Sequence, residues 1–132
     1  HLLHATAIPL LLLNFAENTI KYEVVAGEVL EIYIVIYETS NSSFHISIWD
    51  TGQGFSENML NKLQNIEEYL EREDYHIGIS NVILRARHVY PKSAFSFCNR
   101  PGAGAQIDIE LPLLPFEAVK ENLYVYQSAD CR

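Results

Sequence analysis

Two pairs of segments, in which apolar and polar residues alternate, restrict the folds that this chain can adopt. Residues 29–38 and 44–49 are separated by a short polar turn, and residues 94–99 and 106–111 flank a glycine-containing turn. Alternation with a period of two, in segments rich in β-branched and aromatic residues, predicts strands. Strands joined by short turns pair antiparallel. The sequence therefore predicts two β-hairpins.

Three helices are predicted around these hairpins. Residues 9–22 begin with a proline, which suits a first helical turn, residues 57–70 follow the capping residue Ser56, and residues 80–90 carry an apolar face. The resulting order predicts a two-layer α+β sandwich, with a mixed, mostly antiparallel sheet and helices on one face. Further expectations are a solvated acidic loop at 67–74 and a last helix at 116–124.

Two of these helices have predicted core-facing sides. The first would turn Leu10, Leu13, Ala16 and Ile20 toward the sheet. For the third, the apolar positions are Val82, Ile83, Ala86, Val89 and Tyr90.

Composition narrows the classes of function. The 132 residues suffice for one domain with its own core, and a hydrophobic share of 48% is typical of a globular protein. A formal charge of −8 argues against a nucleic-acid surface. No apolar run reaches the ~20 residues that span a bilayer, and the N-terminus lacks the features of a signal peptide. Any membrane attachment is expected outside this sequence.

The two cysteines, Cys98 and Cys131, have no metal-ligand spacing. Cys98 lies in an apolar run and is predicted to be a buried thiol, because free cysteine packs as a small hydrophobic residue.

The first helix carries a polar stripe. Asn14, Asn18 and Lys21 are spaced i, i+4 and i+7 and share one helical face, with Glu17 at its edge. Paired asparagines are uncommon in a helix, and an amide oxygen is a suitable neutral ligand for Mg²⁺ or its waters. Lys21 could meet phosphate oxygens as a point charge. A plain solvent-exposed face also accounts for this pattern.

A second motif follows the second strand. Asp50 stands where that strand ends, and Gly52 and Gly54 come directly after it. A carboxylate accepts hydrogen bonds from an exocyclic amine such as that of adenine, and glycines let a planar ring approach the backbone. A β-turn without a binding function would have the same residues.

Two more glycine motifs complete the set. Gly78 precedes a helix start, where free N–H groups and the helix dipole favour an anion. Gly102 and Gly104 lie in the turn between the last two strands. A simple helix cap and a simple hairpin turn are the alternatives.

The order of the four motifs resembles the ATP-binding catalytic domain of sensor histidine kinases, over residues 8–113. The first helix, with Pro9, Glu17, Asn18, Ile20, Lys21 and Tyr22, is similar to the first box of the YesM/LytS-type branch. DTGQGF, HIGISNVILRARHVY and RPGAGAQIDIELPL resemble its three glycine boxes.

This resemblance implies a Bergerat-type fold and the binding of Mg²⁺ and ATP. Asn18 would be the metal ligand, and Asn18 and Lys21 would be catalytic. Asp50 would bind the adenine amine, and residues 65–76 would form a lid. The implied ATP-contacting residues are Asn14, Asn18, Lys21, Tyr22, Asp50, Gly52, Gly54, Ile77, Gly78, Ile79, Gly102 and Gly104.

The resemblance also implies an arrangement and partners. Residues 8–114 would form the catalytic domain, after a residual linker at 1–7 and before a C-terminal extension at 115–132. The family transfers the γ-phosphoryl group of ATP to a histidine on a separate dimerisation domain, which then serves a response regulator. The chain would be the cytoplasmic portion of a membrane-anchored sensor kinase.

Some residues depart from the family pattern. His76 stands where a glycine is common, and Ala103 and Ala105 replace frequent glycine and threonine. The lid is acidic, and like charge would weaken the binding of a triphosphate. Gyrase-like or chaperone-like ATPases and anti-sigma-type serine kinases share the fold but carry a glutamate where this chain has Asn14. A degenerate, non-catalytic signalling module is the other alternative.

Overall fold

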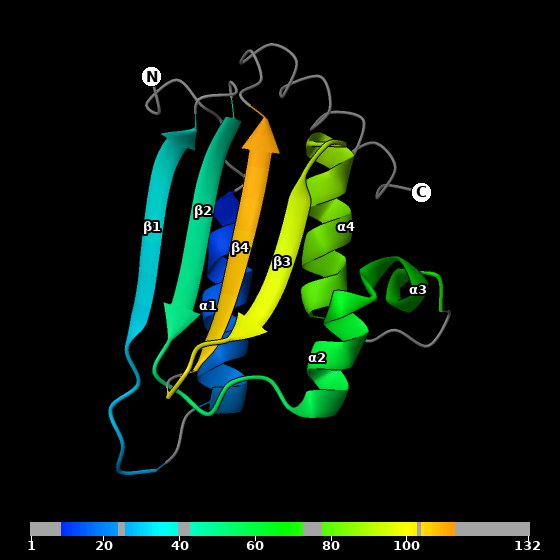
Figure 1. Ribbon diagram of the computed structural model, residues 1–132. Coiled ribbons are helices and arrows are strands. Elements are labelled where there is room, and N and C mark those ends of the chain that lie inside the picture. Colours follow the sequence, from blue (N-terminus) through cyan, green and yellow to red (C-terminus); the bar gives the residue numbers. More distant parts are fainter. Residues whose placement is uncertain (1–8, 24–25, 40–42, 73–77, 103, 113–132) are drawn as a thin grey trace.

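A four-stranded antiparallel sheet organises the chain, in the strand order β1-β2-β4-β3 (Figure 1). The computed structural model describes residues 9–23, 26–39, 43–72, 78–102 and 104–112. The strands are β1 (Ile32–Thr39), β2 (Ser43–Asp50), β3 (Ala94–Asn99) and β4 (Ala105–Pro112). The helices are α1 (Pro9–Glu23), α2 (Glu57–Gln64), α3 (Ile66–Leu70) and α4 (Ile79–Val89).

Both predicted hairpins form, and β2 pairs with β4 to join them. Ile46 lies opposite Ile109, and Ile48 lies opposite Ile107, so the two central strands share an aliphatic face. Helices α1 and α4 cover that face of the sheet and leave the other open (Figure 1). The predicted α+β class is confirmed, and the described sheet is antiparallel throughout instead of mixed.

The core lies between the central strands and the two long helices. Its aromatic members meet edge to face, with the rings of Phe44 and Tyr90 6.5 Å apart. The described part of the predicted face of α4 is confirmed as buried. The buried apolar residues are Phe15, Phe44, Ile46, Ile48, Leu63, Val82, Ile83, Ala86, Tyr90, Phe97, Ala105, Ile107, Ile109 and Leu111.

The predicted core face of α1 is wrong at Leu13 and Ile20, while Ala16 is half-buried and the Leu10 side chain lies outside what the structure describes. Leu13 and Ile20 are 51% and 55% exposed, whereas Phe15 is 1% exposed and Leu12 packs against the core. The first half of α1 is apolar on nearly every side, so the periodicity of its leucines did not define one face. The buried face is defined by the bulky Phe15, and Asn18, about one turn later, lies on the same side of the helix.

The predicted helix at 57–70 is divided at Asn65. Ser56 caps its start as predicted, since its hydroxyl accepts a hydrogen bond from the backbone N–H of Met59 at 3.2 Å. Asn65 leaves helical geometry, and its amide donates to the carbonyl of Asn61 at 2.9 Å. Asparagine competes with helix continuation in this way. The residues that follow form α3, which lies within the predicted helix and overlaps the start of the predicted acidic loop.

Arg87 of α4 binds α3. It donates two hydrogen bonds to the carboxylate of Glu67, at 2.9 and 2.6 Å, and these hold the pKa of Glu67 below its usual value. Glu68 is bound by Arg72 at 3.2 Å. These two acids of the predicted lid therefore carry partners, while Glu73 and Asp74 lie outside the described residues.

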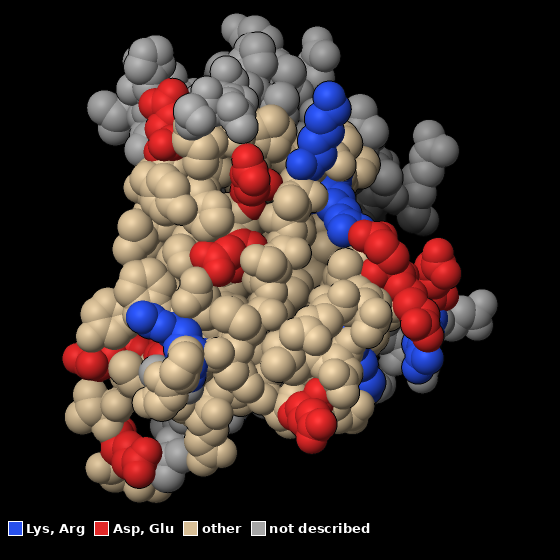
Figure 2. Space-filling view, viewed as in Figure 1, with Lys and Arg blue, Asp and Glu red and all other residues tan. Residues whose placement is uncertain are grey.

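The open face of the sheet is polar and aromatic. Tyr33 stacks on Trp49 with ring centroids 5.4 Å apart, and the guanidinium of Arg100 lies 4.8 Å from the Trp49 ring. Acidic side chains are scattered over this face (Figure 2). Cys98 is exposed here, which corrects its prediction as a buried thiol. Its strand alternates, and Phe95 and Phe97 take the core side.

The described residues contain no helix long and apolar enough to cross a membrane. The predicted linker at 1–7, the helix at 116–124 and Cys131 lie outside them.

The buried hydroxyl of Tyr90 generates one prediction. Burial raises the pKa of Tyr90 to about 12, and its oxygen has no hydrogen-bond partner among the described residues. A buried unpaired hydroxyl costs roughly 1–3 kcal/mol. Tyr90→Phe should therefore leave the free energy of unfolding unchanged or higher in urea denaturation. Tyr90→Ala, the control, should lower it by about 3–5 kcal/mol. A clear loss in Tyr90→Phe would contradict this account.

Asp108 generates a prediction about pH. Partial burial alone would raise the pKa of Asp108, but hydrogen bonds from Ser47, His45 and Gln106 outweigh it and lower the pKa. The carboxylate thus contributes stability that is present above its unfolded pKa and is lost as the pH falls through the folded pKa. Asp108→Asn should make the unfolding free energy less dependent on pH between about 5 and 2. An equally steep acid decline in both proteins would refute the assignment.

Candidate functional site

Four of the predicted motifs meet at one end of the molecule. The segment after β2, the turn between β3 and β4, the last turn of α1 and the first turn of α4 all lie at the lower end in Figure 1. This juxtaposition follows from strand direction, because β2 and β3 end there and β4 begins there.

Asp50 is the buried acid of this end. It is 2% exposed, and its Oδ1 accepts hydrogen bonds from the backbone N–H groups of Gly52 at 2.9 Å and Ala105 at 3.2 Å. Within the described residues, Oδ2 takes part in no such bond. The carboxylate is therefore held through one oxygen by backbone from two separate segments, and the second oxygen remains as an acceptor.

Gly104 makes this arrangement possible. A Cβ atom on Gly104 would lie 1.8 Å from Oδ1 of Asp50 and 2.7 Å from the nitrogen of Gly52. Its own N–H donates to the carbonyl of Asp50 at 3.2 Å. The turn between β3 and β4 thus packs directly against the segment after β2. The absence of a side chain at Gly104 is required for this contact rather than for backbone conformation.

The other glycines play different parts. Gly54 adopts a φ of +82°, and a Cβ there would meet the Asn99 amide at 2.7 Å. Gly102 has a φ of +67° with nothing within 4 Å, so it serves the turn and does not touch Asp50. Of these two predicted ATP-contacting residues, Gly104 is the one that packs against Asp50.

Asn18 and Gly78 form the second half of the site. The Asn18 Oδ1 lies 3.8 Å from the position that a Cβ on Gly78 would occupy. Gly78 has a φ of +144°, which side-chain-bearing residues rarely adopt, and it precedes the first turn of α4. The N–H groups of a helix start carry partial positive charge. An amide oxygen and an anion-attracting helix end are therefore neighbours.

The remaining described residues of the predicted site belong to α1 and to the start of α4. Asn14 is half-buried on α1, while Lys21 is exposed near its end. Ile79 packs partly into the core. Ile77 and the Tyr22 side chain lie outside what the structure describes.

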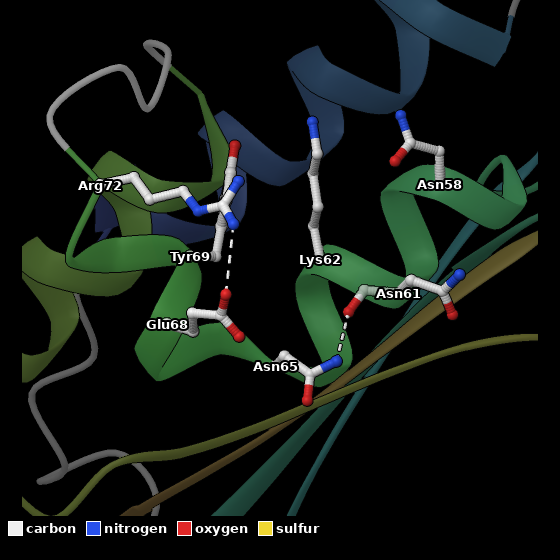
Figure 3. Close-up of a pocket in the computed structure, with 7 residues that line it drawn as sticks. All are labelled: Asn58, Asn61, Lys62, Asn65, Glu68, Tyr69 and Arg72. Carbon is white, nitrogen blue, oxygen red and sulfur yellow. Dashed lines mark hydrogen bonds and ion pairs between the residues drawn. The ribbon is translucent and has the colours of Figure 1, made fainter.

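A pocket of about 260 Å³ adjoins α2 and α3; it contains none of the predicted ATP-contacting residues, but four of its lining residues belong to the predicted lid at 65–76. Lys62 and Tyr69 point their polar ends in the same direction there, while the guanidinium of Arg72 binds Glu68 (Figure 3). The pocket is lined by Asn58, Asn61, Lys62, Asn65, Glu68, Tyr69 and Arg72.

No protein-family model and no curated protein matches this chain. Among solved structures, 23 chains match. One is the histidine kinase domain from the blue-light activated histidine kinase of Erythrobacter litoralis EL346, with a TM-score of 0.57 and 16% sequence identity. The match covers 79% of this chain and 42% of that one, so the chain spans less than half of this neighbour. The likeness shows that the chain has a histidine-kinase-like fold.

The contact between Gly104 and Asp50 generates a prediction about the site. In Gly104→Ala the new methyl group would overlap the Asp50 carboxylate, so one of the two segments must move. We expect a loss of about 2–4 kcal/mol in unfolding free energy, as for other overpacked or strained sites. Gly102→Ala is the matched control in the same turn, and strain alone should cost it about 1–2 kcal/mol. Equal losses in thermal denaturation would show that the close approach has no special role.

Proposed function

We propose that this chain is the ATP-binding catalytic domain of a sensor histidine kinase, of the YesM/LytS type. It binds Mg²⁺ and ATP and transfers the γ-phosphoryl group to a histidine on a separate dimerisation domain. The observation that carries the proposal is the buried Asp50, held by Gly52 and Ala105 through one oxygen with Gly104 packed against it. The histidine-kinase-like fold supports it.

Asp50 is suited to adenine recognition. Its Oδ1 is committed to the backbone, whereas Oδ2 can accept a hydrogen bond from the exocyclic amine of the purine. Because the carboxylate is buried and fixed, such a bond is made without ordering a mobile side chain. The glycines on either side let the ring come close to the main chain.

The phosphates would lie toward α1 and α4. There the Asn18 oxygen faces Gly78 and the first turn of α4, whose N–H groups favour an anion. Lys21, one turn after Asn18, adds a positive charge at the end of the same helix. A chain of charge −8 needs such local donors to hold a triphosphate.

The amide oxygens of α1 are suitable ligands for a magnesium ion that is bound together with a nucleotide. Asn18 offers one neutral amide oxygen, with Asn14 one turn before it, and Mg²⁺ completes its six oxygen ligands with phosphates and water. Bound in this way, the metal would neutralise phosphate charge. The contribution of the chain is then to orient the nucleotide, which is most of what phosphoryl transfer requires.

A histidine kinase fits α1 better than a hydrolase does. ATPases and serine kinases of this fold need a base for water or a hydroxyl, one helical turn before the metal-binding asparagine. Here that position is Asn14, and Glu17 is exposed and turned about 100° from Asn18. A histidine nitrogen as acceptor does not need a base at this place.

The proposal implies partners beyond this chain. They are a histidine-bearing dimerisation domain of the same full-length protein and a response regulator, with any membrane attachment through segments outside this sequence. Nucleic acid is not an expected ligand.

Asp50→Asn tests the proposal with little change in shape. The amide oxygen of the new side chain can still accept from Gly52 and Ala105, but an NH₂ group replaces Oδ2 and would face the purine amine donor to donor. We expect the unmodified chain to bind a non-hydrolysable ATP analogue with Mg²⁺ in titration calorimetry. The variant should bind about 10- to 100-fold more weakly, as for a lost hydrogen bond to a charged group.

The outcomes separate the alternatives. Asp108→Asn, which makes the same change on the open face, should bind like the unmodified chain. No binding by the unmodified chain would favour the degenerate signalling module. Steady hydrolysis of ATP by the isolated chain would favour the gyrase-like or chaperone-like ATPase, and transfer to a serine would favour the anti-sigma-type kinase.

A further inference from the structure

Asn99, a residue outside all four motifs, holds the loop that carries Gly54. It stands at the end of β3, and its side-chain amide bonds both backbone groups of Phe55. Its Oδ1 accepts from the N–H of Phe55 at 2.7 Å, and its Nδ2 donates to the carbonyl of Phe55 at 2.8 Å. The amide therefore pairs with a residue 44 positions away as a neighbouring β-strand would.

This pairing explains why position 54 is glycine. A Cβ on Gly54 would lie 2.7 Å from Oδ1 and 2.9 Å from Cγ of Asn99, so the amide fills the space that a side chain would use. Phe55 is also held through its side chain, since its ring meets that of the buried Phe97 edge to face, with ring centroids 6.2 Å apart.

The β3–β4 hairpin thus holds both ends of the loop formed by residues 50–55. Asn99 is the register partner of Ala105, and the N–H of Ala105 bonds Asp50. One rung of the hairpin therefore anchors the start of the loop through Ala105 and its end through Asn99. The intervening turn is itself closed by a bond from the Arg100 N–H to the Gly104 carbonyl at 3.0 Å.

We infer that Asn99 is a positioning residue for the nucleotide site, which sets the backbone of residues 52–55 against the purine through its two bonds to Phe55. The inference rests on the proposed function, because the ligand that benefits is the nucleotide placed there. Asn99 itself acts through Phe55 and does not touch the ligand. Fixing the loop before binding removes an ordering cost that a free loop would impose.

Asn99→Ala is the direct test. It removes both bonds, and we expect the Mg²⁺–ATP analogue to bind about 10-fold more weakly at a temperature where the variant is fully folded. Asn99→Asp keeps an acceptor for the Phe55 N–H but loses the donor, so it should weaken binding by at least as much. Gln106→Ala is the matched control, since Gln106 lies on the same hairpin and bonds Asp108 at 2.7 Å on the open face. It should bind like the unmodified chain.

A double substitution tests whether Asn99 and Gly54 act on the same loop. Gly54→Ala creates a clash with Asn99 in addition to its backbone strain, and Asn99→Ala removes that clash. The loss of affinity from Gly54→Ala should therefore be several-fold smaller in the Asn99→Ala background.

Hydrogen exchange of the Phe55 amide separates failure of this inference from failure of the proposed function. In the nucleotide-free protein, Asn99→Ala should speed that exchange at least about 10-fold, as for the loss of a backbone-like hydrogen bond, and Gln106→Ala should leave it unchanged. If the unmodified chain binds nucleotide but Asn99→Ala binds equally well, the inference is overturned. Unchanged Phe55 exchange overturns it also. If no form binds nucleotide, the proposed function fails and the ligand-positioning role of Asn99 fails with it, even where Phe55 exchange changes.

Discussion

The structure of the site depends on one close approach, that of the Gly104 main chain to the Asp50 carboxylate. Asp50 is buried at the end of a central strand, and an unpaired carboxylate there would be costly. Backbone N–H groups supply its partners, and they reach it only because Gly104 has no side chain. One oxygen is thereby satisfied while the other remains an acceptor.

The fold was largely predictable because its strands alternate cleanly. Residues 94–99 were assigned with the bounds of β3, since Phe95 and Phe97 mark its buried side. The rotation of α1 was not predictable, because leucines occupy nearly every position before Phe15. The break at Asn65 also escaped prediction, since it depends on a bond from the side chain to Asn61 that competes with the helix.

Motif spacing selected the residues of the candidate site but did not predict the contacts among them. Motif spacing selected Asp50, Gly52 and Gly104, and the structure brings these together. It did not reveal that Gly102 and Gly104 have different reasons to be glycine, one conformational and one steric. Asn99 was missed for a related reason: an amide that substitutes for a β-strand leaves no periodic signal, and its partner Phe55 is distant in sequence.

The bidentate bond between Arg87 and Glu67 has a consequence for how α3 is held. Glu67 is largely exposed, so counter-ions reach this pair and screen it. α3 has no fully buried residue, and its Ile66 and Leu70 pack only partly against the core, so the ion pair supplements a small apolar contact. Raising the ionic strength should therefore weaken the attachment of α3 more than that of the sheet and the long helices, whose core side chains are buried.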